Sequence, residues 1–180
     1  LIPDAIKNKA ELIVTVGAIQ SNHARQTAAA CALMGLKCLI VLEQRLQNAP
    51  EVYMNSGNIF LDKLFGADIK ICPKDQNIEN YSSKIVEDFK SKGTNVYFIP
   101  GGGSNAIGAL GYVECLNEII KENNKYNLTQ IVHATGSAGT QSGLLAGRKY
   151  FNFNIPVTGI SVMNDKTTQE NKVFIEAKNA

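Results

Sequence analysis

Residues 12–34 read LIVTVGAIQSNHARQTAAACALM, in which a β-branched run leads through a polar turn into an alanine-rich segment. The run at residues 12–16 is continuously apolar, which is typical of a strand covered on both faces of a sheet. Alanine is a strong helix former, and its small side chain allows a helix at 23–34 to pack closely on that sheet. This stretch therefore predicts a strand and a helix, with a polar turn at the carboxyl end of the strand.

The same alternation continues through the rest of the chain. Further apolar runs predict strands at residues 38–42, 69–72, 96–99, 128–134 and 157–162. Helical patterns occupy residues 58–65, 78–89 and 107–120, and a further helix is expected after the loop at 135–140 and up to about residue 150. Residues 44–57 are expected to form a long irregular loop. Strands that alternate with helices require right-handed crossovers and parallel pairing. The predicted fold class is therefore α/β, with doubly wound parallel sheets.

The composition excludes several classes of protein. The chain has 180 residues, of which 44% are hydrophobic and 19% charged, as in ordinary folded domains. The net charge is +2 without a basic run, so we expect no nucleic-acid partner. The apolar runs are far shorter than the roughly 20 residues that cross a bilayer, so we expect no membrane partner. No leader is visible, which favours a cytoplasmic location, and the start at Leu1 rather than Met is compatible with a piece of a longer protein.

The cysteines and histidines do not have the spacing of a metal site. The cysteines are scattered along the chain, at Cys31, Cys38, Cys72 and Cys115. We therefore predict no bound metal and reduced, buried thiols. His133 lies inside an apolar run and is expected to be a core side chain. His23 stands beside a helix start, where a structural role is favoured over that of the main acid–base residue.

Three loops at strand ends carry the candidate chemistry, because ligands of α/β folds bind at the carboxyl ends of the strands. The first loop contains four consecutive polar residues, Gln20, Ser21, Asn22 and His23. A Ser or Asn at this place can simply cap the helix by accepting a backbone N–H bond. Four polar residues exceed the needs of one cap, and the helix start favours a nearby anion. A ligand site is therefore favoured.

The other two loops are rich in glycine. Residues 135–140, TGSAGT, place glycines, hydroxyls and backbone N–H groups at a helix start, which is a phosphate-binding arrangement without the lysine of an ATPase P-loop. Residues 100–105, PGGGSN, fit the loose dinucleotide pattern G-x-G-x-x-A at Gly101, Gly103 and Ala106. The next strand ends without the carboxylate that would hold a ribose. Asp165 follows the strand after the 136–139 loop, so a dinucleotide site remains an alternative.

Three segments resemble the pyridoxal-phosphate-dependent D-cysteine desulfhydrase and 1-aminocyclopropane-1-carboxylate deaminase family. They are VTVGAIQSNHARQTAAA at 14–30, IPGGGSN at 99–105 with Gly108, Gly111 and Tyr112, and TGSAGT at 135–140 with Gly143, Leu144, Leu145 and Gly147. The form QSNHARQ at 20–26 is more similar to the desulfhydrase branch. The resemblance implies the tryptophan-synthase-β-like fold, incomplete at both ends. Residues 1–100 would form the small lobe and 101–180 part of the large cofactor-binding lobe.

The resemblance also implies the roles of individual residues. Ser21 would be catalytic, as a nucleophile or proton relay, and the substrate would be bound around its carboxylate by Gln20, Ser21 and His23. Asn22 would bind the 3-oxygen of the cofactor ring, and the cofactor phosphate would be held by Gly136, Ser137, Ala138, Gly139 and Thr140. The cofactor, pyridoxal 5'-phosphate, serves as an electron sink. The implied reaction acts on a small amino acid, D-cysteine first of all, which would yield pyruvate, sulfide and ammonia. Deamination of the cyclopropane amino acid is the alternative. A homodimer is expected for the complete protein.

The sequence departs from the family in one respect that bears on activity. The family lysine that carries the cofactor lies in an Asn-Lys-x-Arg-Lys-like segment upstream of the first matching strand. Lys7 and Lys9 stand in IKNKAE at 6–11, which does not fit that segment, so neither is assigned this role. The chain alone is expected to bind the cofactor phosphate weakly and not to complete the reaction. A non-catalytic phosphate- or nucleotide-binding module and a structural remnant without a ligand remain alternatives.

Overall fold

The computed structural model describes residues 1–180 apart from the side chain of Asn124. The chain divides into two compact units, Leu1–Gly102 and Gly103–Ala180, and each is described by itself. The division lies two residues beyond the lobe boundary predicted at residue 100.

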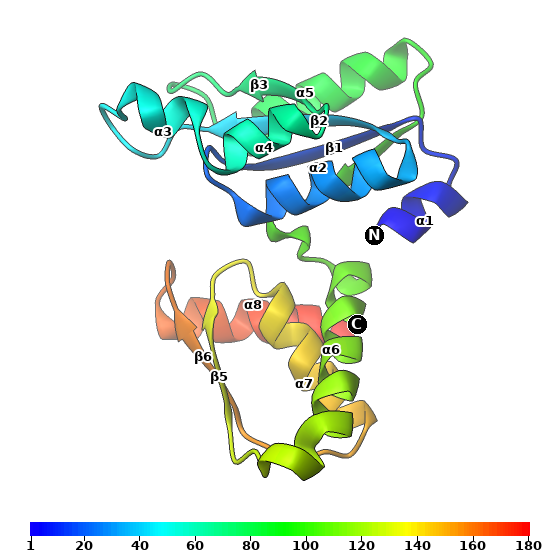
Figure 1. Cartoon of the computed structure of the whole chain (residues 1–180), viewed down its shortest axis with the longest axis vertical. Helices are drawn as coiled ribbons and strands as arrows, with labels where there is room; N and C mark the ends of the chain where they lie inside the picture. The colour runs from blue at the N-terminus through cyan, green and yellow to red at the C-terminus, as the bar shows by residue number, and fades with distance from the viewer. The chain divides into compact units, whose positions relative to one another are not determined.

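The first unit is built on a parallel sheet of four strands, in the order β3-β2-β1-β4 (Figure 1). The strands are β1 (Leu12–Ala18), β2 (Lys37–Glu43), β3 (Asp68–Ile71) and β4 (Val96–Ile99). The chain first moves outward from β1 to β3 and then returns to place β4 on the other side of β1. The strand order therefore reverses between β1 and β4, and such a switch point is where open α/β sheets bind ligands. The polar turn after β1 lies at this point.

Helices cover both faces of this sheet (Figure 1). One face packs against α1 (Ile2–Lys7), α2 (Asn22–Met34) and α4 (Asn58–Leu64), and the opposite face packs against α5 (Ile78–Ser91). Ile13 and Ile40 enter the first core, whereas Val14 and Val41 enter the second, as the two-residue period of a strand requires. The predicted doubly wound α/β fold is thus confirmed, and the two central strands are buried on both faces.

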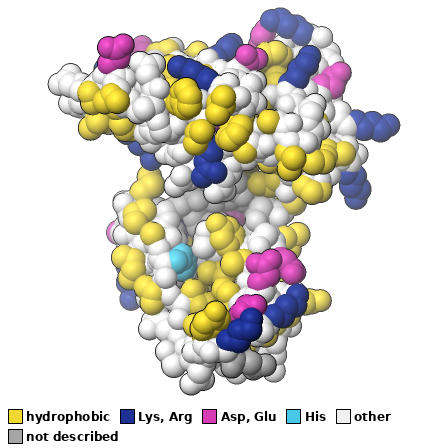
Figure 2. Space-filling view, viewed as in Figure 1, with side chains coloured by type: hydrophobic (Ala, Val, Ile, Leu, Met, Phe, Trp, Pro, Cys, Tyr) yellow, Lys and Arg dark blue, Asp and Glu magenta, His cyan; other side chains and the backbone are white. Residues whose placement is uncertain are grey.

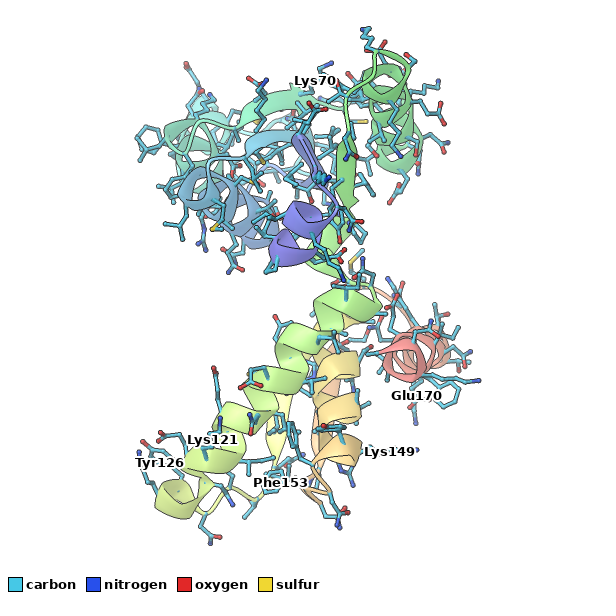
Figure 3. All side chains as sticks on the ribbon, turned by 90° about the vertical axis from the view of Figure 1, so that its right-hand side faces the viewer. Lys70, Lys121, Tyr126, Lys149, Phe153 and Glu170 are labelled. Carbon is cyan, nitrogen blue, oxygen red and sulfur yellow. The ribbon has the colours of Figure 1, made fainter. Side chains whose placement is uncertain are left out.

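The second unit combines three long helices with a parallel pair of strands. Its elements are α6 (Ala106–Tyr126), β5 (Ile131–Thr135), α7 (Gly139–Tyr150), β6 (Val157–Ser161) and α8 (Lys166–Asn179). Figure 3 shows α6 and α7 side by side, with Tyr126 at the end of α6 and Phe153 just after α7. Glycines on α7 allow this close approach, since a Cβ on Gly147 would lie 3.2 Å from the Cα of Val113.

Several local expectations are wrong. Residues 44–57 are not wholly irregular, because α3 (Glu51–Asn55) forms within them. The strand expected at 128–134 begins only at Ile131, because Asn127 ends α6 in the left-handed conformation, with φ of 49°, and the chain turns before it pairs. Helix α8 was not predicted, because its apolar residues do not follow a clear helical period. Its buried residues are Gln169 and Val173.

Continuous apolar runs also overstated the burial of the outer strands. In β5 and β6, Val132 and Ile160 are 59% and 57% exposed, because these strands form a pair rather than the centre of a sheet. The residues of edge strand β3 are exposed or half-buried for the same reason. Figure 2 accordingly shows apolar side chains among the charged ones on the visible surface of both units.

Candidate cofactor site

Ser21 caps helix α2. Its Oγ accepts the backbone N–H of Ala24 at 3.1 Å, and its own backbone is extended, with φ of −69° and ψ of 121°. Gly17 allows the turn to close over this side chain, since a Cβ there would lie 2.8 Å from the Ser21 Oγ. The cap uses a lone pair of the hydroxyl and leaves its hydrogen free to donate. The capping role and the predicted ligand role are therefore chemically compatible.

The Gln20 side chain is committed to the protein's own backbone. Its Nε2 donates to the carbonyls of Tyr53 and Ser56, at 2.7 and 2.9 Å, and its Oε1 accepts the N–H of Asn58 at 2.8 Å. Both N–H donors of the carboxamide are used in this way. Donation to a substrate carboxylate would require one of these bonds to break, so substrate binding by Gln20 stays a prediction with that added cost.

Asn22 presents a free donor. Its exposed side chain accepts a hydrogen bond at Oδ1 from the Nδ2 of Asn58, at 3.1 Å. The Asn22 Nδ2 has no hydrogen-bond partner among the residues that the structure describes. An N–H₂ donor suits a negatively charged oxygen, as the predicted contact with the cofactor ring requires.

His23 is hydrogen-bonded to the strand that precedes it. Its Nε2 lies 2.8 Å from the Oγ1 of Thr15, which donates to the carbonyl of Ile99 at 2.9 Å. Since a carbonyl can only accept, the single hydroxyl hydrogen of Thr15 is used there, and His23 must donate from Nε2. Burial lowers the pKa of His23 below its ordinary value of 6.5. The neutral ring therefore carries its proton on Nε2 and leaves Nδ1 as an acceptor.

Nuclear magnetic resonance of the imidazole nitrogens tests this assignment. We expect His23 to titrate below pH 6.5, with the Nε2–H tautomer in its neutral form. Because the folded-state pKa is lowered, protonation favours the unfolded chain, and stability is lost as the pH falls below about 6.5. Replacing Thr15 with valine removes the acceptor and should weaken the preference for the Nε2–H tautomer. A neutral ring protonated on Nδ1 would contradict the assignment.

His133 is not the buried core side chain that its position in an apolar run predicts. It is half-buried on β5, where its Nδ1 lies 2.9 Å from the carbonyl of Ala134. Its Nε2 has no partner among the described residues. The prediction fails because β5 belongs to a two-stranded sheet and is not covered on both faces.

The loop at residues 136–140 forms the start of α7. Ala138, which precedes the helix, has φ of 82° and offers no side-chain cap. The first N–H groups of α7 thus have no side-chain oxygen from the N-cap position, which leaves donors for an anion. Gly139 is buried and packed so closely that a Cβ there would lie 2.6 Å from the Oγ of Ser104. The loop has the chemistry that a phosphate group requires.

Ser104 supports this loop from the neighbouring glycine-rich segment. Its Oγ accepts the N–H of Gly139 at 3.1 Å and donates to the Oγ of Ser137 at 2.7 Å. Asn105, the next residue, caps α6 by accepting the N–H of Gly108 at 2.8 Å. The sequence marked PGGGSN as unusual but did not assign Ser104 to the phosphate loop. A contact over 35 residues has no local signal.

The acidic residue of the alternative dinucleotide site has a structural role as a helix cap. Asp165 caps α8, with its carboxylate accepting the N–H and the hydroxyl of Thr168 at 3.0 and 2.6 Å. These bonds lower the pKa of Asp165. The carboxylate is thus occupied by its own helix.

The largest features outside the two loops are not part of the candidate site. An open groove of about 950 Å³ lies among α7, β6 and α8, and its lining includes Thr135 but none of residues 136–140.

Among the described residues, no cluster of His, Cys, Asp or Glu is arranged to hold a metal ion. All four cysteines are free thiols, and Cys115 is half-buried where burial was predicted. None of the described helices has both the length and the apolar character needed to cross a membrane.

The fold and these two loops define a class of protein. The polar donors at the switch point of the parallel sheet and the glycine-rich helix start of the second unit are each suited to an anionic group. The chain belongs to the pyridoxal-phosphate-dependent enzyme family, whose model matches residues 1–174.

Individual relatives narrow the comparison. The chain is 38% identical over 175 residues to a D-cysteine desulfhydrase of Serratia proteamaculans (strain 568), which covers 96% of this chain and 53% of the relative. A D-cysteine desulfhydrase of Salmonella typhi is 37% identical, with 97% and 53% covered. The crystal structure of an ACC deaminase homologue is 33% identical, with a TM-score of 0.87 over 99% of this chain and 53% of that one. The chain spans about half the length of the curated relatives it matches.

Proposed function

We propose that the whole protein is a pyridoxal-phosphate-dependent lyase that acts on a small amino acid, with D-cysteine as the first candidate. The observation that carries this proposal is the 37–38% identity to D-cysteine desulfhydrases over nearly all of this chain. D-Cysteine and one water would yield pyruvate, hydrogen sulfide and ammonia. The second candidate, 1-aminocyclopropane-1-carboxylate deamination, is favoured by the similarity to the ACC deaminase homologue.

The residues of the two loops fit the cofactor. The N-cap residue of α7 offers no side-chain acceptor, and Ser104 accepts only the N–H of Gly139, so donors of the first turn remain for the phosphate. The glycine at 139 leaves no room for a Cβ, and we assign Gly136, Ser137, Ala138, Gly139 and Thr140 to the phosphate. Asn22 has a free N–H₂ group for the ring 3-oxygen. When bound, pyridoxal phosphate supplies an electron sink for the bond changes of the substrate.

The turn after β1 supplies groups that can hold or move a proton. The Ser21 hydroxyl keeps its hydrogen while it caps α2, and the neutral His23 keeps an acceptor at Nδ1. We assign Ser21 as the catalytic residue and His23 as a substrate-binding residue on these grounds. Gln20 contributes by holding the turn, and it would bind substrate only after giving up one of its backbone contacts. We further propose that the complete protein works as a homodimer in the cytoplasm.

Sulfide and pyruvate release test the function. The whole protein, loaded with pyridoxal phosphate, should release both in equal amounts from D-cysteine and far less from L-cysteine. Ammonia with 2-oxobutanoate from the cyclopropane amino acid, and no sulfide, would favour the deaminase instead. The 180-residue chain alone should release no sulfide, because its lysines do not match the family's cofactor-carrying segment. Robust sulfide release by this chain would refute that last expectation.

Binding of pyridoxal phosphate tests the phosphate loop separately. Titration of the chain followed by cofactor absorbance should show at least tenfold weaker binding for Gly139→Ala, because the new methyl group displaces Ser104 and distorts the loop. Gly111→Ala is the matched control, since a Cβ at Gly111 meets nothing within 4 Å. Equal affinities of the two variants would remove residues 136–140 from the proposal.

A further inference from the structure

Asn58, the first residue of α4, is tied to the turn after β1 although it lies 38 residues from Gln20. Its backbone N–H donates to the Gln20 Oε1 at 2.8 Å, and its Nδ2 donates to the Gln20 carbonyl at 2.9 Å and to the Asn22 Oδ1 at 3.1 Å. With the two bonds from Gln20 Nε2 to Tyr53 and Ser56, these contacts form what we call the Gln20–Asn58 latch. The latch joins the α3–α4 segment to the candidate site.

The latch determines which end of the Asn22 carboxamide faces outward. The oxygen and nitrogen of an amide have nearly the same shape, so only their hydrogen-bond partners distinguish them. The Gln20 backbone carbonyl can only accept, which requires the Nδ2 of Asn58 at that position. The second hydrogen of the same Nδ2 then meets Asn22 and requires an acceptor, which is Oδ1. The Asn22 Nδ2 is thereby left as the outward end.

Gly57 shows that the approach of Asn58 to Gln20 is built into the backbone. Its φ is +64° with ψ of −134°, a conformation that residues with a side chain rarely adopt. A Cβ on Gly57 would lie 2.5 Å from the Gln20 Oε1, which accepts the N–H of Asn58. A glycine at this position thus permits the N-terminus of α4 to contact the turn.

We propose that Asn58 is a positioning residue of the cofactor site, which holds Asn22 with its N–H₂ group outward as a donor to the negatively charged ring oxygen. The inference rests on the proposed function in so far as Asn22 is assigned to that oxygen. Asn58 does not touch the cofactor in this scheme. It acts by excluding the flipped Asn22 amide, whose oxygen would repel the ring oxygen.

The substitution Asn58→Asp tests the proposal because a carboxylate cannot donate to Asn22. Asn22 should then turn its Nδ2 toward residue 58, and the affinity for pyridoxal phosphate should fall at least tenfold. An Asp is favourable in the first turn of a helix, so the variant is expected to fold. Asn58→Ala, which releases Asn22 without adding charge, should weaken binding less. Asn80→Asp, the same change at an exposed position of α5, is the matched control and should bind like the parent chain.

A double substitution that includes Asn22→Ala distinguishes positioning of Asn22 by Asn58 from a general structural role of Asn58. In Asn22→Ala, which has no amide to orient, Asn58→Ala should weaken pyridoxal-phosphate binding no further. A further loss in that background would overturn the proposal, as would parental affinity of Asn58→Asp, while the cofactor assignment itself would stand.

Nuclear magnetic resonance of the side-chain amides tests the orientation of Asn22 independently of the proposed function. In the parent chain the Asn58 N–H₂ should exchange slowly with solvent and the Asn22 N–H₂ rapidly, and Asn58→Asp should slow the latter. If the chain binds no pyridoxal phosphate but shows these exchange rates, the cofactor assignment is contradicted and the orientation of Asn22 is supported. The reverse exchange pattern in the parent would overturn the orientation.

Discussion

Replacing Gly143 with alanine should lower the free energy of unfolding of the second unit by about 3 kcal/mol, the upper part of the range for overpacking. Gly143 lies where α7 crosses α6. A Cβ there would overlap the carbonyl oxygen of Ala109 and lie 2.5 Å from the Cβ of Tyr112. Because the obstacle is backbone rather than the end of a flexible side chain, the two helices must separate to admit the methyl group.

Gly111→Ala provides the comparison for this effect. Gly111 lies on α6, is exposed, and has no atom within 4 Å of its would-be Cβ. That variant should gain up to about 1 kcal/mol from the better helix propensity of alanine. Urea unfolding followed by circular dichroism, with hydrogen exchange of the α6 and α7 amides, measures both variants. Unchanged protection of these amides in Gly143→Ala would show that the two helices do not pack as described.

Asp62→Asn should stabilise the first unit at neutral pH. The Asp62 side chain on α4 is fully buried, and neither carboxylate oxygen has a partner among the described residues. Burial raises the pKa of this carboxyl to about 6, with Arg25 opposing the shift. Since the folded-state pKa lies above the unfolded value of about 3.9, a proton stabilises the folded state, and that stability is lost as the pH rises from about 4 to 6.

The advantage of the asparagine variant should therefore depend on pH. It should be near zero below about pH 3, where Asp62 is neutral in both states, and reach about 3 kcal/mol at pH 7. Unfolding by urea across this range measures it. Asp75→Asn, which removes one negative charge from an exposed position, serves as the control and should show no such increase. A pH-independent difference for Asp62→Asn would contradict the burial of an unpaired carboxylate.

Much of the fold is predictable from local pattern. The runs at 12–16, 38–42 and 96–99 all form strands of one parallel sheet, since β-branched residues in short runs between helical segments leave few other arrangements. Burial of the outer strands could not be predicted in the same way. An apolar run looks alike in the centre of a sheet and in the pair β5-β6, where Val132 and Ile160 remain exposed.

The residues of the candidate site could be predicted from the sequence, but the hydrogen bonds that each of them makes could not. The resemblance singled out Gln20 through His23 and residues 136–140 without showing which of their polar atoms are free. Both side-chain N–H groups of Gln20 donate to the carbonyls of Tyr53 and Ser56, whereas the side-chain donors of Ser21 and Asn22 have no such partner in the described part of the chain. Asn58 and Ser104 had no signal at all as parts of these loops, because each acts over more than 30 residues of chain.

The order of residues by itself determined the α/β class, the parallel pairing and the membership in a cofactor-dependent family, because these follow from periodicity and short motifs. The tertiary structure decided which end of Asn22 faces outward, which nitrogen of His23 carries the proton, and that Asp62 is buried without a partner. Each of these depends on contacts between segments far apart in the chain. Such contacts are set by how the helices pack on the sheet, and no local stretch of sequence records them.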